Sequence, residues 1–92
     1  MPLPTPQNCH MSPDNTGVLF EVEIYGRMRK GFITTEAIGS LYPAQPNLVQ
    51  AVSNSSEISR GLAKRIATGS DDEHAPILLS SMMLDGKGRW TI

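Results

Sequence analysis

Cys9, His10 and Met11 form the first group of side chains in this sequence with a distinctive chemistry. A thiolate, an imidazole and a thioether are all ligands that soft metal ions accept. A zinc site normally needs about four ligands at short, regular spacings, and the chain offers only one more histidine, His74. We therefore predict no metal site and no cofactor. A metal-dependent protein that uses Cys9, His10 and His74 is kept as an alternative.

The adjacent Cys9 and His10 also resemble a nucleophile with its base. Neighbouring residues in a flexible segment are not held in attack geometry, and nothing nearby would orient the imidazole. His74 follows an acidic run at residues 71–73, but this run lacks the alternating oxygen ligands and the turn glycine of a calcium loop. We can name no catalytic residue, and the sequence favours a protein that is not an enzyme.

Arg27, Arg29 and Lys30 form the densest basic group of the chain, and Gly31 follows them. Their charges could meet phosphate groups or an acidic protein. A glycine also lets a partner strand approach the main chain closely. We predict that Arg27, Arg29, Lys30 and Gly31 bind an unknown protein partner. A nucleic-acid-binding module that uses residues 27–30 is the alternative, although few base-stacking aromatic residues are interleaved with them.

Composition limits the classes of protein that remain. The 92 residues suffice for one domain, and a net charge of -1 gives no overall attraction to nucleic acid or to an anionic membrane. The first residues lack the basic and apolar regions of a secretory signal. No apolar run approaches the roughly 20 residues that span a bilayer. We expect a cytoplasmic protein that does not bind membranes and is a monomer or a weak dimer.

The basic group lies in a predicted β-hairpin. Phe20, Val22 and Ile24 alternate with other residues, as in a half-buried strand. Gly26 can adopt the positive φ of a tight turn. The return strand runs from about residue 28 to residue 33, and neither of its faces is cleanly apolar. We expect this return strand at the edge of the sheet, where its charges also oppose aggregation.

Two helical regions follow the hairpin. Thr34 or Thr35 caps a short helix, because a threonine hydroxyl can accept a hydrogen bond from a first-turn amide. Asn47 caps a second region that runs to about residue 68 with its apolar residues on one face. The poor helix formers at residues 54–56 leave open whether this region is one helix or two.

The order of elements predicts an α+β fold. Four of the seven prolines lie in residues 1–16, which we expect to be a disordered N-terminal tail. Residues 17–92 then form a single domain with two layers. Its small, mostly antiparallel sheet has three strands, or four if residues 89–92 add one, and two helices cover one face. The last strand, within residues 76–84, is expected beside the first. The predicted core contains Phe20, Val22, Ile24, Ile38, Leu41, Leu62 and Ile66.

Several residues match a pattern of strand, glycine turn, short strand, capped helix, long helix and closing strand. They are Val18, Phe20, Gly26, Ile33, Thr34, Glu36, Ala37, Ile38, Ile58, Leu62, Ala63, Ile77 and Leu79. In this pattern the chain resembles a family of short uncharacterised bacterial proteins, a domain of unknown function. The resemblance covers about residues 17 to 84 and implies the fold, but that family brings no established site residues. The chain departs from it at Gly31, in the proline-rich start and in "DGKGRWTI".

The hypothesis for function follows from these points. An apolar scaffold is evident and a catalytic set is not, which favours a small non-enzymatic interaction module of a bacterial cytoplasm. The hairpin of residues 18–33 would be its recognition edge, because a partner strand can add to an edge strand.

Overall fold

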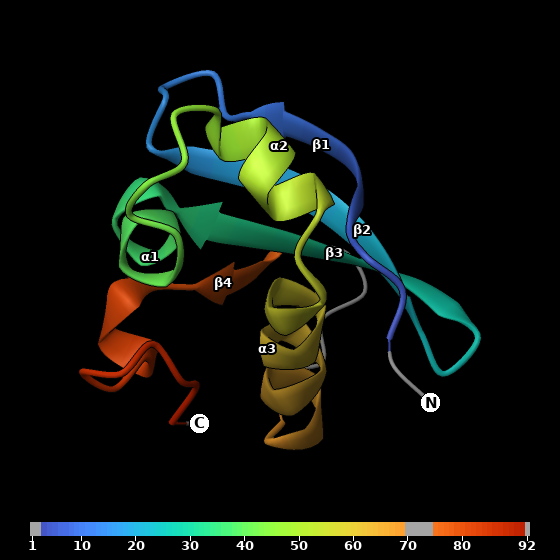
Figure 1. The fold of residues 1–92 in the computed structure, drawn as a ribbon. Coiled ribbons are helices and arrows are strands. Elements are labelled where there is room, and N and C mark those ends of the chain that lie inside the picture. Colours follow the sequence, from blue (N-terminus) through green and yellow to red (C-terminus); the bar gives the residue numbers. More distant parts are fainter. Residues whose placement is uncertain (1–2, 70–74, 92) are drawn as a thin grey trace.

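A computed structural model describes residues 3–69 and 75–91 of the chain. One sheet contains four strands in the order β1-β2-β3-β4. The helices gather on one side of it (Figure 1). The predicted two-layer α+β fold is confirmed, with a mixed sheet. The elements are β1 (Gln7–Met11), β2 (Gly17–Ile24), β3 (Arg27–Thr34), α1 (Thr35–Leu41), α2 (Leu48–Ser53), α3 (Ser56–Ala67), β4 (Ile77–Leu79) and the 3₁₀ turn η1 (Ser81–Met83).

The predicted hairpin forms the centre of the sheet. Tyr25 and Gly26 join β2 to β3 with φ values of 53° and 81°, the positive pair found in type I′ turns. β1 runs antiparallel to β2, and β4 runs parallel to β3 along Gly31–Ile33. The prediction that β3 is the edge strand, with the last strand beside the first, is therefore wrong. A connection through helices joins parallel strands, and β1 already occupies the outer side of β2.

Residues 7–11 form a strand where the sequence predicted a disordered tail, so that prediction is wrong for this segment. A bulge between Gln7 and His10, with Asn8 at a φ of 54°, interrupts the pairing with β2. A bulge shifts the alternation of side chains, which hides the strand in the sequence. Before β1, the Ser59 hydroxyl of α3 donates a hydrogen bond to the Pro4 carbonyl at 2.6 Å. The packed domain therefore includes residues that precede Gly17.

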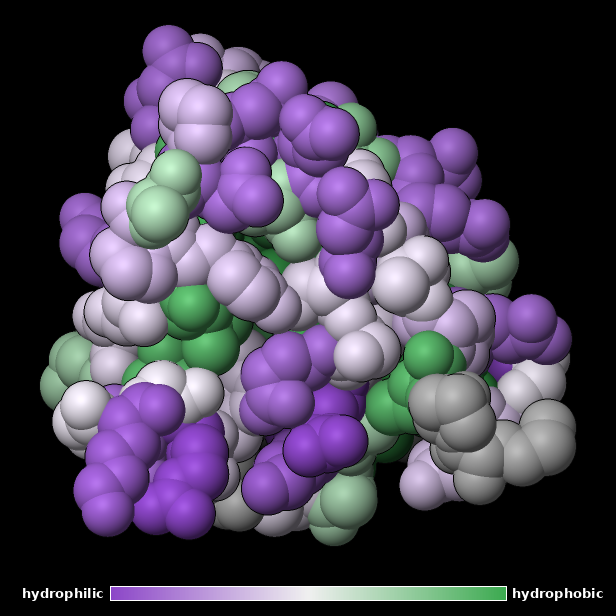
Figure 2. All heavy atoms as spheres, in the orientation of Figure 1, coloured by the Kyte–Doolittle hydropathy of each residue, from purple (hydrophilic) through white to green (hydrophobic). Residues whose placement is uncertain are grey.

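The core lies between the sheet and the helices. The alternation predicted for β2 is confirmed, and on β3 the residues that face the helices are Arg29, Gly31 and Ile33. The predicted core residues that are buried are Phe20, Val22, Ile24, Ile38 and Leu62, while Leu41 and Ile66 lie partly buried against them. The opposite side of the helix layer faces solvent, and Figure 2 shows it covered mainly by hydrophilic residues with smaller hydrophobic areas between them.

Gly31 lies directly opposite Phe20 in the pairing of β2 and β3. The Phe20 ring lies over it, so that a Cβ atom at position 31 would stand 2.4 Å from the ring Cζ. A side chain there would displace one of the largest fully buried side chains of the core. The glycine at which the chain departs from the resembled family therefore has a packing role.

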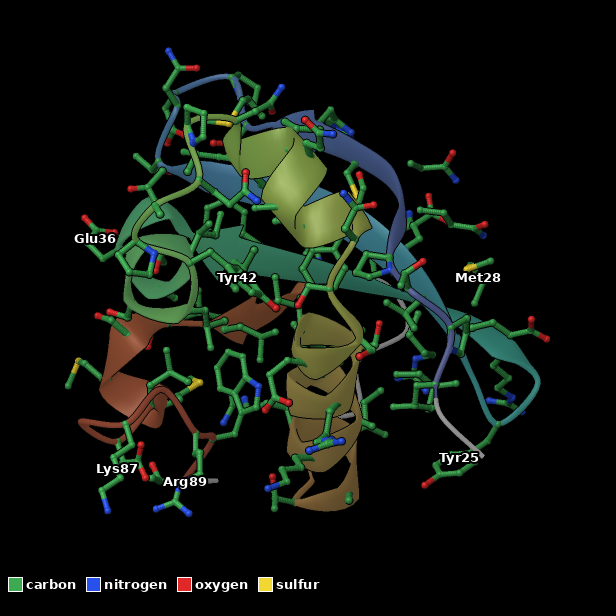
Figure 3. All side chains as sticks on the ribbon, in the orientation of Figure 1. Tyr25, Met28, Glu36, Tyr42, Lys87 and Arg89 are labelled. Carbon is green, nitrogen blue, oxygen red and sulfur yellow. The ribbon has the colours of Figure 1, made fainter. Side chains whose placement is uncertain are left out.

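Residues 47–68 form two helices. Ser55 caps α3, because its hydroxyl accepts a hydrogen bond from the Ile58 amide at 3.2 Å. The same hydroxyl is hydrogen-bonded to the hydroxyl of Tyr42, at the end of α1 (Figure 3). The predicted cap of α1 is Thr34, which accepts from the Ala37 amide at 3.2 Å. Serine and threonine favour such caps over helix interiors.

The segment after β4 returns to α3. The predicted strand over residues 76–84 is shorter than expected, since η1 follows it. Trp90 makes an isolated bridge with Leu84 and adds no strand to the main sheet. Its indole packs on Gly61, where a Cβ atom would stand 2.4 Å from Cε2, and its Nε1 donates to the Glu57 carbonyl at 2.9 Å. Trp90 is thus part of the core.

Candidate functional site

The two faces of the sheet have different neighbours. One packs on the helices, and across residues 3–69 and 75–91 no helix lies against the other (Figure 1). We call this second surface the open sheet face. The strand residues that point to it are Gln7, His10, Leu19, Glu21, Glu23, Met28, Lys30, Phe32 and Leu78.

The strand register arranges these side chains in rows. His10, Leu19, Phe32 and Leu78 are direct neighbours on β1, β2, β3 and β4. The row is apolar from β2 to β4, and Leu78 is 44% exposed. Side chains at directly paired positions lie close together on one face of a sheet, so Leu19, Phe32 and Leu78 form one apolar strip.

A charged row runs beside the apolar strip. Glu21 and Lys30 lie directly opposite each other on β2 and β3. Their side chains project from the same face, and no ion pair between them is formed in the described structure. A hollow of about 270 Å³ opens here, with a lining that includes His10, Leu19, Glu21 and Lys30. This volume is close to the lower limit of ligand pockets, about 300 Å³, and suits a side chain or a small ligand.

The residues predicted to bind a partner do not share one surface. Arg29 points to the helix side and is 6% exposed, whereas Lys30 points to the open sheet face. Arg27 is exposed beside the turn, opposite Ile24. Gly31 is covered by the Phe20 ring. Successive residues of a strand point to opposite faces, and for this reason Lys30 is separated from Arg27 and Arg29.

The same alternation separates Cys9 from His10. Cys9 packs against the core, while His10 is exposed and its Nδ1 lies 3.1 Å from the Asn8 carbonyl oxygen. Burial raises the pKa of the Cys9 thiol above its ordinary value, and a hydrogen bond with Ser53 opposes this rise. In the described parts of the chain no cluster of His, Cys, Asp and Glu could hold a metal ion. His74 lies outside those parts.

Two carboxylates organise turns. Asp14 Oδ1 accepts from the hydroxyls of Ser12 and Thr16, at 2.7 Å each, in the turn between β1 and β2. These hydrogen bonds hold the pKa of Asp14 below its ordinary value. Asp85 accepts from the backbone amides of Arg89 and Lys87, which lowers its pKa in the same way. Both groups shape loops and lie away from the open sheet face.

Comparisons of the chain with models of protein families, with curated proteins and with solved structures found no match. The resemblance to a bacterial family therefore stays a prediction that rests on the sequence pattern. Over the described residues, no helix combines the length and the apolar composition needed to cross a membrane.

Proposed function

We propose that this chain is a small, non-enzymatic interaction module of a bacterial cytoplasm and that its open sheet face binds a protein partner. The apolar strip of Leu19, Phe32 and Leu78 carries this proposal. Contiguous apolar side chains that no other element covers are typical of interaction sites. The charges of Glu21 and Lys30 beside the strip would fix the orientation of the partner.

The open sheet face replaces the hairpin edge as the predicted contact. β4 pairs with Gly31–Ile33, and β1 pairs with the outer side of β2. Strand addition to the hairpin could therefore reach only its part near the turn, residues 22–30, because among the described strands the outer positions of the sheet belong to β1 and β4. The open sheet face instead offers side chains from all four strands.

Nucleic acid suits this surface less well than a protein does. Phe32 and His10 could stack on bases and Lys30 could meet a phosphate. However, Glu21 and Glu23 share the face, and the net charge is -1. Carboxylates beside the binding groups would repel the phosphate backbone, which dominates the affinity of nucleic-acid complexes.

Site-specific photo-crosslinking tests the proposal. A photoreactive amino acid would replace Leu78 on the open sheet face or, as the control, Ala67, which is exposed on α3. We expect a discrete protein adduct in cells from position 78 and none from position 67. Adding Leu19→Glu should remove the adduct, with far-UV circular dichroism confirming the fold. Adducts from both positions, or from neither, would contradict a protein partner on this face, and an adduct to nucleic acid would establish the alternative.

A further inference from the structure

The charge pattern of the open sheet face is self-complementary. Resting on the proposed function, we propose that the partner is a second copy of this chain. The two copies pack sheet on sheet about a two-fold axis that runs along the strands, between β2 and β3. The inference follows from the register of the hairpin and from the sign of the two charges in its middle.

The register supplies the symmetry. Glu21 is directly opposite Lys30, and Leu19 is directly opposite Phe32. A two-fold axis between the two strands places β2 of one copy over β3 of the other. Each Glu21 then faces Lys30 of the second copy, and the reverse contact occurs at the same time. Two ion pairs form, each between opposite charges, and no like charges are in contact.

The apolar strip meets itself under the same rotation. Leu19 faces Phe32 of the second copy, and His10 at one end faces Leu78 at the other. Stacked sheets pack about 10 Å apart, a separation that side chains of these sizes fill. Because such sheets cross at about 30°, contacts near the axis are maintained while those at the outer strands diverge. Leu19, Glu21, Lys30 and Phe32 are therefore the positions that decide the contact.

The size of the face predicts a weak dimer. Four strands place the outer two about 14 Å apart, and eight residues of strand extend about 25 Å. Because β1 and β4 are shorter than eight residues, the patch measures less than roughly 350 Å² per copy, below the roughly 800 Å² per partner of a standard stable interface. Dissociation in the micromolar range or above is expected, so the dimer should depend on concentration.

Charge reversal provides the test. Glu21→Lys gives a face with two lysines, and Lys30→Glu gives a face with two glutamates. Each variant alone should lose self-association by about tenfold or more in sedimentation equilibrium, because like charges then meet across the axis. An equimolar mixture of the two variants should associate again, since every lysine faces a glutamate of the other chain. Lys87→Glu, on the exposed turn after η1, should leave self-association unchanged.

The mixture separates contacts between chains from those within one chain. Each variant places like charges side by side on its own hairpin, and mixing cannot repair that pair. Recovery in the mixture therefore reports the contact between copies. Circular dichroism of each variant shows whether it is folded, and the Glu21→Lys/Lys30→Glu double variant, which again carries one charge of each sign, should dimerise like the wild type.

Three results would overturn the inference. A wild-type dimer with an equimolar mixture that stays monomeric means that another surface joins the copies. A wild type that is monomeric throughout the micromolar range, with the adduct at position 78 still present, means that a different protein occupies the open sheet face, and the proposed function then stands. Loss of both the dimer and the adduct contradicts the proposed function itself.

Discussion

The two faces of the sheet carry apolar side chains for different reasons. On the helix side, Val18, Phe20 and Val22 are buried against the helix layer. On the open sheet face, Leu19, Phe32 and Leu78 form a strip that remains partly exposed. Apolar burial is the main stabilising contribution to folding, so the first face supports the fold. The second face adds little to the stability of a single chain, because its apolar side chains become buried only when a partner covers them.

The largest predicted difference uses matched leucines. Leu62 on α3 is fully buried, whereas Leu78 on the open sheet face is 44% exposed. Leu62→Ala should lower the free energy of unfolding by about 2–5 kcal/mol, since it removes buried methyl groups and leaves a cavity. Leu78→Ala should change it by less than about 1 kcal/mol. Urea unfolding of both variants at low protein concentration measures this difference.

Equal decreases in the free energy of unfolding for the two leucine variants would show that a second layer already covers the open sheet face within the chain. In that case the contrast between the faces is wrong. An unchanged stability in Leu62→Ala would instead show that α3 is not packed as the structure has it.

The second prediction compares glycines on the inner face and on the surface. A Cβ atom at Gly31 would stand 2.4 Å from the Phe20 ring, while nothing lies within 4 Å of one at Gly39 in α1. Gly31→Ala should cost about 1–3 kcal/mol, because overpacking forces the ring to move. Gly39→Ala should stabilise the helix by about 0.5–1 kcal/mol. Thermal melting compares the two, and a neutral Gly31→Ala would show that the Phe20 ring is not packed on Gly31 as the structure has it.

Local features of the fold were predictable from the sequence. The alternation in β2 and the turn at Gly26 depend on neighbours in the chain, and so do the caps at Thr34 and Asn47. The positions of β1 and β4 depend on distant pairings. β1 is polar and interrupted by a bulge, which leaves no periodic pattern, and β4 pairs with only three residues of β3.

The open sheet face could not be predicted from the charged residues of the hairpin. Leu19 lies on the polar side of β2, and in the sequence neither face of β3 is cleanly apolar. The sequence indicates the open sheet face in one way: an apolar residue lies on the polar side of one strand, and a second lies on its hairpin neighbour. The basic residues are close in the sequence, but the pleat sends Arg29 and Lys30 to opposite faces.

A third prediction concerns the helix layer, which lies on the side of the sheet away from the open sheet face. Ser55 caps α3 and bonds to the Tyr42 hydroxyl, whereas the neighbouring Ser56 is exposed. Ser55→Ala should cost about 0.5–2 kcal/mol, in keeping with the loss of a helix cap. Ser56→Ala is the matched control and should be nearly neutral. Chemical denaturation measures these two costs. Sedimentation equilibrium should show an unchanged dimer under conditions where both variants stay folded, since the cap lies on the other side of the sheet.

The smallest predicted effect depends on pH and concerns the support of β1, which brings His10 to the open sheet face. Hydrogen bonds from Ser12 and Thr16 lower the pKa of Asp14 below its ordinary value of 3.8. A lowered pKa in the folded state stabilises the fold above the ordinary value, and this stabilisation is lost as the pH falls through the lowered value. The Asp14→Asn variant lacks this contribution at every pH. The unfolding free energies of wild type and Asp14→Asn should therefore converge as the pH falls below 3.8. Over the same pH range, amide hydrogen exchange in the wild type should be faster in β1 than in α3. A constant difference across that range would show that the Asp14 turn does not hold β1 through its charge, and that pairing with β2 alone places His10 on the open sheet face.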